Sequence, residues 1–251
     1  MIDKLLCSRI EDMLHRAERG EATCSPFLNE TQRAETAEYL QGRTGELMTA
    51  FFGGYEDSER TRLFIYPEYY DFEELCGCIR AVEIKGSGYV ELRHSSFLGA
   101  LTSLGIDRSK MGDIVIKDNS AILFADEKIA EFLLSDPSPL SRVGRDTVKI
   151  REFEVTADFG NNREYKDIFD TVASPRLDSV VASLASLSRE RAKQLILSGQ
   201  VMVNHIPRDK TDITVNEGDV VTVRSYGKFR IGALSDRTKK DRYKLLAKKY
   251  I

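Results

Sequence analysis

Hydrophobic positions near the start of the chain recur at the three-to-four-residue spacing of an amphipathic helix. This stripe predicts a helix over residues 2–19, and a second helix is predicted over residues 31–40. Residues 62–66 form a short apolar run that ends at a proline, which predicts a strand. Together these elements predict a small N-terminal α/β unit over residues 1–75.

The middle of the chain alternates apolar and polar positions more regularly, as half-buried strands do. The pattern predicts, in order, strands 78–85 and 89–92, helix 95–104, strands 113–117 and 120–124, helix 126–134 and strand 147–155. Gly86, Ser87 and Gly88 predict a hairpin between the first two strands. This order predicts a central RRM-like β-sheet domain over residues 76–160, with its helices on one face.

The last part of the chain has shorter apolar segments. A polar stretch at residues 156–171 predicts a linker. After it, the pattern predicts helices over residues 177–184 and 189–198 and strands over residues 201–204 and 220–224. Two helices followed by a small sheet form the predicted C-terminal domain, residues 175–251, and the whole chain is predicted to be α+β.

Charge is unevenly distributed along the chain. Residues 175–251 hold 16 Lys and Arg against 8 Asp and Glu, whereas residues 1–174 hold 21 against 32. The net charge of −3 therefore hides an acidic body and a basic C-terminal end. A basic excess over a whole domain favours nucleic acid as the partner, because a small phosphorylated ligand does not need so broad a surface.

Composition excludes several classes of protein. The longest uncharged stretch, residues 194–207, has 14 residues, fewer than the roughly 18 that a membrane span requires. Charges near the N-terminus interrupt any apolar core of a secretory signal. The four cysteines and three histidines are too sparse for a disulfide framework, a metal site or a catalytic triad. We therefore expect a cytoplasmic, monomeric protein with reduced thiols, no cofactor and no metal.

Four short motifs in the basic end share their order and spacing with a known RNA-binding domain. They are Arg176-Leu-Asp178, the segment 188–193, the segment 199–204 and Gly218-Asp219. These motifs resemble the S4 domain, first seen in ribosomal small-subunit protein four. Where that family has a glycine after the asparagine, this chain has His205, in a predicted turn.

The helices of this domain indicate which side chains contact RNA. Arg189 and Lys193 lie four residues apart, so they share one face of the second helix. Arg176 joins them as a candidate phosphate ligand, whereas Asp178 complements the helix dipole or orients a nearby arginine. Asn204 either contacts RNA or stabilises its turn. The candidate RNA-binding residues are Arg176, Ser188, Arg189, Arg191, Lys193, Gln194, Asn204, Arg224, Lys228 and Arg230.

Similarity extends beyond this domain. Residues 92–114, residues 226–230 and the basic residues between 238 and 244 resemble the corresponding parts of bacterial YlmH-like proteins. We expect the ending to form a hairpin rather than a helix, because residues 228–231 alternate. The resemblance implies a cytoplasmic bacterial RNA-binding protein with rRNA or tRNA as its partner. It also implies a role in ribosome-associated quality control, on large ribosomal subunits that carry a stalled peptidyl-tRNA.

The sequence leaves three interpretations open. The first is a non-catalytic RNA-binding module with no DNA or membrane partner. The second is an RNA-modifying enzyme of the pseudouridine synthase or methyltransferase kind, although no cofactor loop, nucleotide-binding fold or large catalytic domain is recognisable. The third is a protein scaffold, linked to cell division, that uses the acidic half of the chain.

A second basic cluster flanks the predicted helix at residues 95–104. Arg93, Arg108 and Lys110 form either a second RNA surface or the solvated ends of a capped core helix. The sequence leaves both interpretations open.

Overall fold

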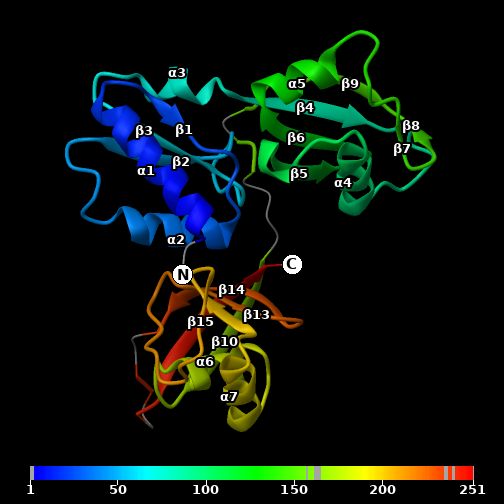
Figure 1. Ribbon diagram of the computed structural model, residues 1–251. Helices are drawn as coiled ribbons and strands as arrows, with labels where there is room; N and C mark the ends of the chain where they lie inside the picture. Colours follow the sequence, from blue (N-terminus) through cyan, green and yellow to red (C-terminus); the bar gives the residue numbers. More distant parts are fainter. Residues whose placement is uncertain (1–2, 157, 161–164, 235–236, 239–240, 251) are drawn as a thin grey trace. The chain divides into compact units, whose positions relative to one another are not determined.

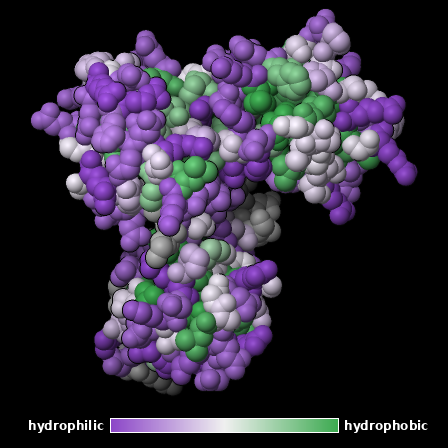
Figure 2. All heavy atoms as spheres, in the orientation of Figure 1, coloured by the Kyte–Doolittle hydropathy of each residue, from purple (hydrophilic) through white to green (hydrophobic). Residues whose placement is uncertain are grey.

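Two units make up the chain, Met1–Asn161 and Asn162–Ile251, and each is described by itself (Figure 1). The computed structural model describes residues 3–156, 158–160, 165–234, 237–238 and 241–250. Within these residues no helix is long and apolar enough to cross a membrane. The surface in view is mostly hydrophilic on both units, with hydrophobic side chains in small groups (Figure 2).

The first unit begins with a three-stranded antiparallel sheet of strand order β1-β3-β2. The elements of this part are α1 (Lys4–Glu18), β1 (Thr23–Cys24), α2 (Glu30–Leu40), β2 (Met48–Phe52), β3 (Arg62–Tyr66) and α3 (Phe72–Cys76). α1 packs its apolar stripe against the sheet, where Leu6, Ile10 and Met13 are buried. The two helices and the strand predicted for this region are confirmed.

The rest of the first unit is built on a four-stranded antiparallel sheet of strand order β5-β6-β4-β9. Its elements are β4 (Ile79–Lys85), α4 (His94–Ser103), the 3₁₀ helix η1 (Arg108–Lys110), β5 (Met111–Lys117), β6 (Ser120–Asp126), α5 (Glu127–Leu134), β7 (Arg142–Val143), β8 (Asp146–Thr147) and β9 (Lys149–Glu152). α4 and α5 bury Phe97, Leu101 and Leu133 in one core with the sheet. Along the chain, the strands of this sheet and the two helices follow the order β-α-β-β-α-β, which fits the predicted RRM-like domain.

The predicted hairpin after β4 is wrong. Residues 86–92 form no strand, and β4 pairs instead with β6 and β9. Ser87 donates its backbone N–H to the buried carboxylate of Asp146 at 2.9 Å. This bond to a residue far along the chain directs the glycine-containing segment into a loop instead of a second strand.

The face of the four-stranded sheet that lies away from α4 and α5 is also buried. Along β6, Ala121 and Leu123 face the helices, whereas Ile122 and Phe124 pack against side chains of the N-terminal sheet such as Phe64. RRM domains bind RNA on the corresponding open sheet face, with stacked aromatic side chains. In this chain that face lies inside the first unit. The predicted domain boundary between residues 75 and 76 stays a prediction.

The second unit contains a six-stranded antiparallel sheet of strand order β10-β15-β14-β13-β11-β12. Its elements are β10 (Tyr165–Val172), α6 (Leu177–Leu184), α7 (Arg189–Leu197), β11 (Val201–Val203), β12 (Ile206–Pro207), β13 (Val220–Val223), β14 (Gly227–Ala233) and β15 (Tyr243–Tyr250). α6 and α7 pack on one face, where Leu177, Ile196 and Phe229 share a core. Both predicted helices and the hairpin of β14 with β15 are confirmed, as is the α+β class. Lys239 and Lys240 lie outside the described residues.

β10 corrects the predicted linker over residues 156–171. It pairs with β15 along its whole length, from Tyr165 opposite Tyr250 to Val172 opposite Tyr243. Of its eight residues only Val172 is buried, so no apolar run marks the strand in the sequence. The sheet of the second unit therefore begins ten residues before the domain boundary predicted at residue 175.

Candidate nucleic-acid interface

Asp178 organises the arginines at the start of the two helices of the second unit. It lies in the first turn of α6 and is 0% exposed. Arg176 donates from Nε to Oδ1 at 3.3 Å, and Arg189 donates from Nε to Oδ2 at 3.0 Å. Because two guanidinium groups share one carboxylate, their positions are fixed before any ligand binds.

Part of each arginine still faces solvent. The Arg176 and Arg189 side chains are 43% and 50% exposed, and several of their N–H donors remain after the bonds to Asp178. Burial raises the pKa of the Asp178 carboxyl, but the hydrogen bonds from Arg189 and Arg176 outweigh burial and hold that pKa below its ordinary value. Asp178 is therefore ionised at neutral pH, and the cluster keeps a net positive charge.

The exposed side of α7 carries the other helical candidates. Ser188 caps the helix by accepting a hydrogen bond from the Arg191 amide at 3.2 Å. Arg191 also donates to the side-chain oxygen of Gln194 at 3.1 Å, and the Lys193 ammonium lies 3.8 Å from the Glu190 carboxylate. Contacts between such surface groups are weak, so an RNA phosphate can replace them at little cost.

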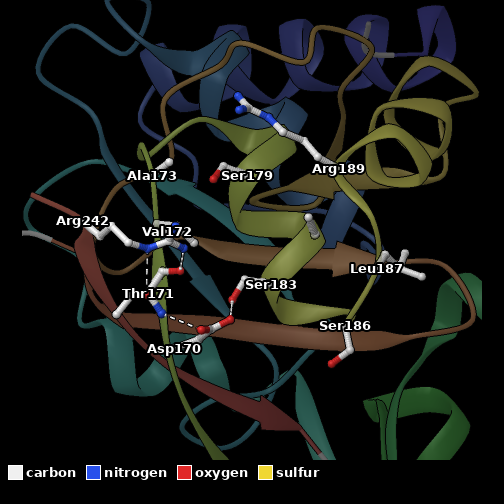
Figure 3. Close-up of a pocket in the computed structure, with 11 residues that line it drawn as sticks. Asp170, Thr171, Val172, Ala173, Ser179, Ser183, Ser186, Leu187, Arg189 and Arg242 are labelled. Atoms are coloured by element: carbon white, nitrogen blue, oxygen red, sulfur yellow. Dashed lines mark hydrogen bonds between the residues drawn. The ribbon is translucent and has the colours of Figure 1, made fainter. Parts of the chain in front are cut away.

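A cavity of about 440 Å³ opens beside Arg189, along β10 and α6 (Figure 3). Thr171, Ser179 and Arg242 contribute polar groups to its lining. Arg242 donates from Nε to the Thr171 hydroxyl at 3.0 Å and is thereby anchored at the cavity. We did not select Arg242 from the sequence as a binding residue, although it belongs to the basic ending that resembles YlmH-like proteins.

Asn204 lies in a tight turn between β11 and β12. Asn204 and His205 have φ values of 50° and 66°, and the flanking residues pair across the turn. The Asn204 side chain donates to Asp219 at 2.7 Å and accepts from the Val220 amide at 2.9 Å. These bonds favour the turn-stabilising role of Asn204 over an RNA contact. His205 occupies a left-handed conformation that glycine adopts without strain.

The remaining candidates lie on the sheet. Lys228 and Arg230 alternate along β14 with Phe229 and Ile231, which are buried in the core shared with α6 and α7. Lys228 and Arg230 therefore point to the opposite face of the sheet. Arg224 is exposed directly after β13. The predicted residues thus occupy two sides of the second unit instead of forming a single surface.

The second basic cluster is split around α4. Arg93 precedes the helix and is 77% exposed, whereas Arg108 and Lys110 lie in η1, beyond its other end. Arg108 donates to the Gly112 carbonyl at 3.0 Å, and burial lowers the pKa of its guanidinium group. Lys110 lies 3.6 Å from the Asp126 carboxylate. An RNA surface at these residues stays a prediction.

Two cysteine thiols of the first unit, which are not among the predicted binding residues, lie in contact. The sulfur atoms of Cys24 and Cys78 are 3.7 Å apart, and Arg62 donates to the Cys78 sulfur at 3.4 Å. The hydrogen bond from Cys24 and the positive charge of Arg62 lower the pKa of the Cys78 thiol to about 7. Within the residues that the structure describes, no group of three or more His, Cys, Asp or Glu could hold a metal ion.

Comparison with known proteins gives two matching family models and one close relative. The model described as "Putative RNA-binding domain in YlmH" matches residues 67–157, and the S4 domain model matches residues 175–221. A Bacillus subtilis (strain 168) protein named ribosome-associated protein quality control protein P2 is 32% identical over 200 residues, which cover 78% of this chain and 76% of that protein. The chain belongs to the YlmH family.

The predicted resemblance to YlmH-like proteins and to the S4 domain is thereby confirmed. The S4 match contains α6, α7 and the Asp178 cluster, and it ends within β13. β10, β14 and β15 lie outside it. Among solved structures, the cell division protein ylmH from Streptococcus pneumoniae has a TM-score of 0.49 and 24% sequence identity, covering 61% of this chain and 91% of that chain. The individual contact residues stay predictions.

Proposed function

We propose that this YlmH-family chain is a non-catalytic factor that docks on structured rRNA or tRNA of large ribosomal subunits carrying a stalled peptidyl-tRNA. The observation that carries the proposal is the pair Arg176 and Arg189, fixed by the buried Asp178 inside the S4 match. The name of the B. subtilis relative, a ribosome-associated quality control protein, supports the ribosome as the place of action. A cytoplasmic location and a monomeric state belong to the same proposal.

Docking through this cluster needs no chemical step. Each guanidinium group can bind a phosphate through parallel hydrogen bonds, and side chains that are already held in place lose little entropy on binding. Neutralised phosphates release counterions, so the affinity falls steeply as salt increases. The deep major groove of A-form RNA is closed to side chains, which favours recognition of RNA shape over sequence.

Sedimentation of the full-length protein through sucrose gradients of cell lysate tests the proposal. The variant Arg176→Gln/Asp178→Asn/Arg189→Gln removes the three charges together, so that no buried carboxylate is left unpaired. Wild-type protein should travel with large subunits at low salt and less at moderate salt. The triple variant should stay at the top of the gradient at both salt concentrations.

A control that lowers the net charge by two, against one for the triple variant, separates the cluster from general loss of positive charge. Lys85→Ala/Lys117→Ala removes two exposed cations of the first unit and should sediment like wild type. Wild-type protein at the top of the gradient at both salt concentrations contradicts ribosome docking. Thermal unfolding checks that the triple variant is folded. If the folded variant still travels with large subunits, the RNA contacts lie elsewhere.

A further inference from the structure

The face of the six-stranded sheet opposite α6 and α7 combines aromatic and basic side chains. We call it the sheet platform. Its aromatic and charged residues on the three strands involved are Tyr165, Asp167 and Phe169 of β10, Lys228 and Arg230 of β14, and Lys244, Lys248 and Tyr250 of β15. All alternate with residues that point to the other side of the sheet. This face lies outside the residues of the S4 match.

Strand register places these side chains in rows across the sheet. Arg230 of β14 pairs with Lys248 of β15, and Lys248 pairs with Asp167 of β10. In a neighbouring row, Tyr250 pairs with Tyr165. Paired residues on neighbouring antiparallel strands point to the same face, so each row is continuous.

Cations and aromatic rings are in contact on the platform. The ammonium group of Lys228 lies 4.9 Å from the centre of the Tyr250 ring, and that of Lys248 lies 5.7 Å from the Tyr165 ring. The centres of the two tyrosine rings are 5.1 Å apart. Cation–π contacts hold the positive charges at the level of the rings, so a ligand meets both together.

Phe169 adds an exposed ring to the same face. It is 76% exposed and lies four residues from Tyr165, about 13 Å along the strand. Between β10 and β14, a hollow of about 260 Å³ is lined by Tyr165, Arg230, Gly232 and Lys248, among others, and the glycine leaves it unfilled. Phe169 therefore presents an exposed ring on the same face as the cations of the platform.

We propose that the sheet platform binds unpaired RNA, with bases stacked on its aromatic rings and phosphates held by its cations. Aromatic rings within a basic groove are the arrangement that binds single strands with little sequence preference. The platform has four cations and one carboxylate, Asp167, so its charge favours an anionic partner. Its aromatic rings favour RNA over an acidic peptide, because bases stack on such rings. The proposal rests on RNA as the partner of the second unit, but it uses the face opposite Arg176 and Arg189.

Fluorescence anisotropy with the full chain and two labelled probes tests this proposal. The probes are a mixed-sequence RNA single strand of about nine nucleotides, within the range that single-strand-binding domains cover, and an RNA hairpin. Phe169→Ala should weaken single-strand binding about fivefold or more, equivalent to about 1 kcal/mol, and leave hairpin affinity within about twofold. Phe169→Tyr keeps the ring and should bind both probes within about twofold of wild type. Arg230→Ala/Lys248→Ala should weaken single-strand binding and flatten its salt dependence.

The outcomes separate the platform from the function proposed above. Unchanged single-strand affinity in Phe169→Ala, or an equal loss for both probes, overturns the platform. Competition by an acidic peptide as effective as that of the RNA strand also overturns it. If the variant Arg176→Gln/Asp178→Asn/Arg189→Gln retains hairpin binding, the result counts against the proposed function alone. Wild-type protein that binds neither probe overturns both.

Discussion

Asp178 is the carboxylate on which the paired arginines depend, so Asp178→Asn is the most direct perturbation of the candidate interface. Asparagine keeps the size of the side chain but removes the charge that balances Arg176 and Arg189. Removing one partner of a buried ion pair costs about 3–5 kcal/mol. Because both arginines are about half exposed, solvent relieves part of their charge, and we expect a loss of about 2–3 kcal/mol.

Calorimetric unfolding of the full chain measures this loss. About 1 kcal/mol shifts the Tm of a domain of this size by roughly 4–8 °C, so the Tm of the second unit should fall by about 10–20 °C. The matched control is Asp241→Asn, which removes an exposed carboxylate that pairs with Arg237 at the surface. This control should change stability by about 0.5 kcal/mol or less. If Asp178→Asn lowers the Tm no more than the control does, the argument for a stabilising shared carboxylate is refuted.

The pH dependence of unfolding gives an independent measurement of the same carboxyl. The pKa of Asp178 lies below its ordinary value in the folded state, so the unfolded chain binds the proton more readily. The stabilisation is therefore complete above the unfolded pKa of about 3.9 and is lost as the pH falls through the lower folded pKa. The stability difference between wild type and Asp178→Asn should be constant from about pH 5 to 7 and shrink in more acidic solution.

Two further predictions concern the turn at His205 and the Cys78 thiol. His205→Gly should stabilise the second unit by about 0.5–1 kcal/mol in urea unfolding, because His205 has a φ of 66°, and an unchanged midpoint would show that its side-chain contacts offset the strain. Cys78 should react with iodoacetamide faster than Cys76 near neutral pH, since its pKa is lowered to about 7 whereas burial raises that of Cys76 to about 11. Mass spectrometry of the alkylated peptides measures both rates, and equal rates at pH 7 contradict the prediction.

Hydrophobic spacing in the sequence located the helices and strands that bury one face of their side chains against a core. The stripe of α1 is visible in the sequence because Ile10, Met13 and Ala17 all face the same core. β10 has no such pattern, because its exposed positions include Phe169 and its pairing with β15 supplies its hydrogen bonds. Such a strand depends on a segment far along the chain, and local periodicity does not reveal it.

The candidate site was predictable by residue type but not by geometry. The S4 motifs identified Arg176 and Arg189 as candidate RNA-binding residues. The position of Asp178 in the first helical turn predicted that it could orient a nearby arginine. A single buried carboxylate, that of Asp178, holds both arginines. This arrangement depends on the packing of α6 against α7, which the sequence does not reveal. The placement of Lys228 and Arg230 on the other side of the sheet was available from the sequence, because both alternate with apolar residues.

The two large sheets of this chain differ in which faces they leave open, and the alternation along one strand of each explains the difference. β6 is apolar at residues 121–124, so both of its faces are buried, one by helices and one by the N-terminal sheet. β14 alternates cations with apolar residues, so helices cover only one of its faces. Recognition of unpaired bases on a sheet requires an open face that carries aromatic rings. The four-stranded sheet resembles an RRM in strand order but buries that face against the N-terminal sheet, whereas the six-stranded sheet has an open face that carries Tyr165 and Phe169.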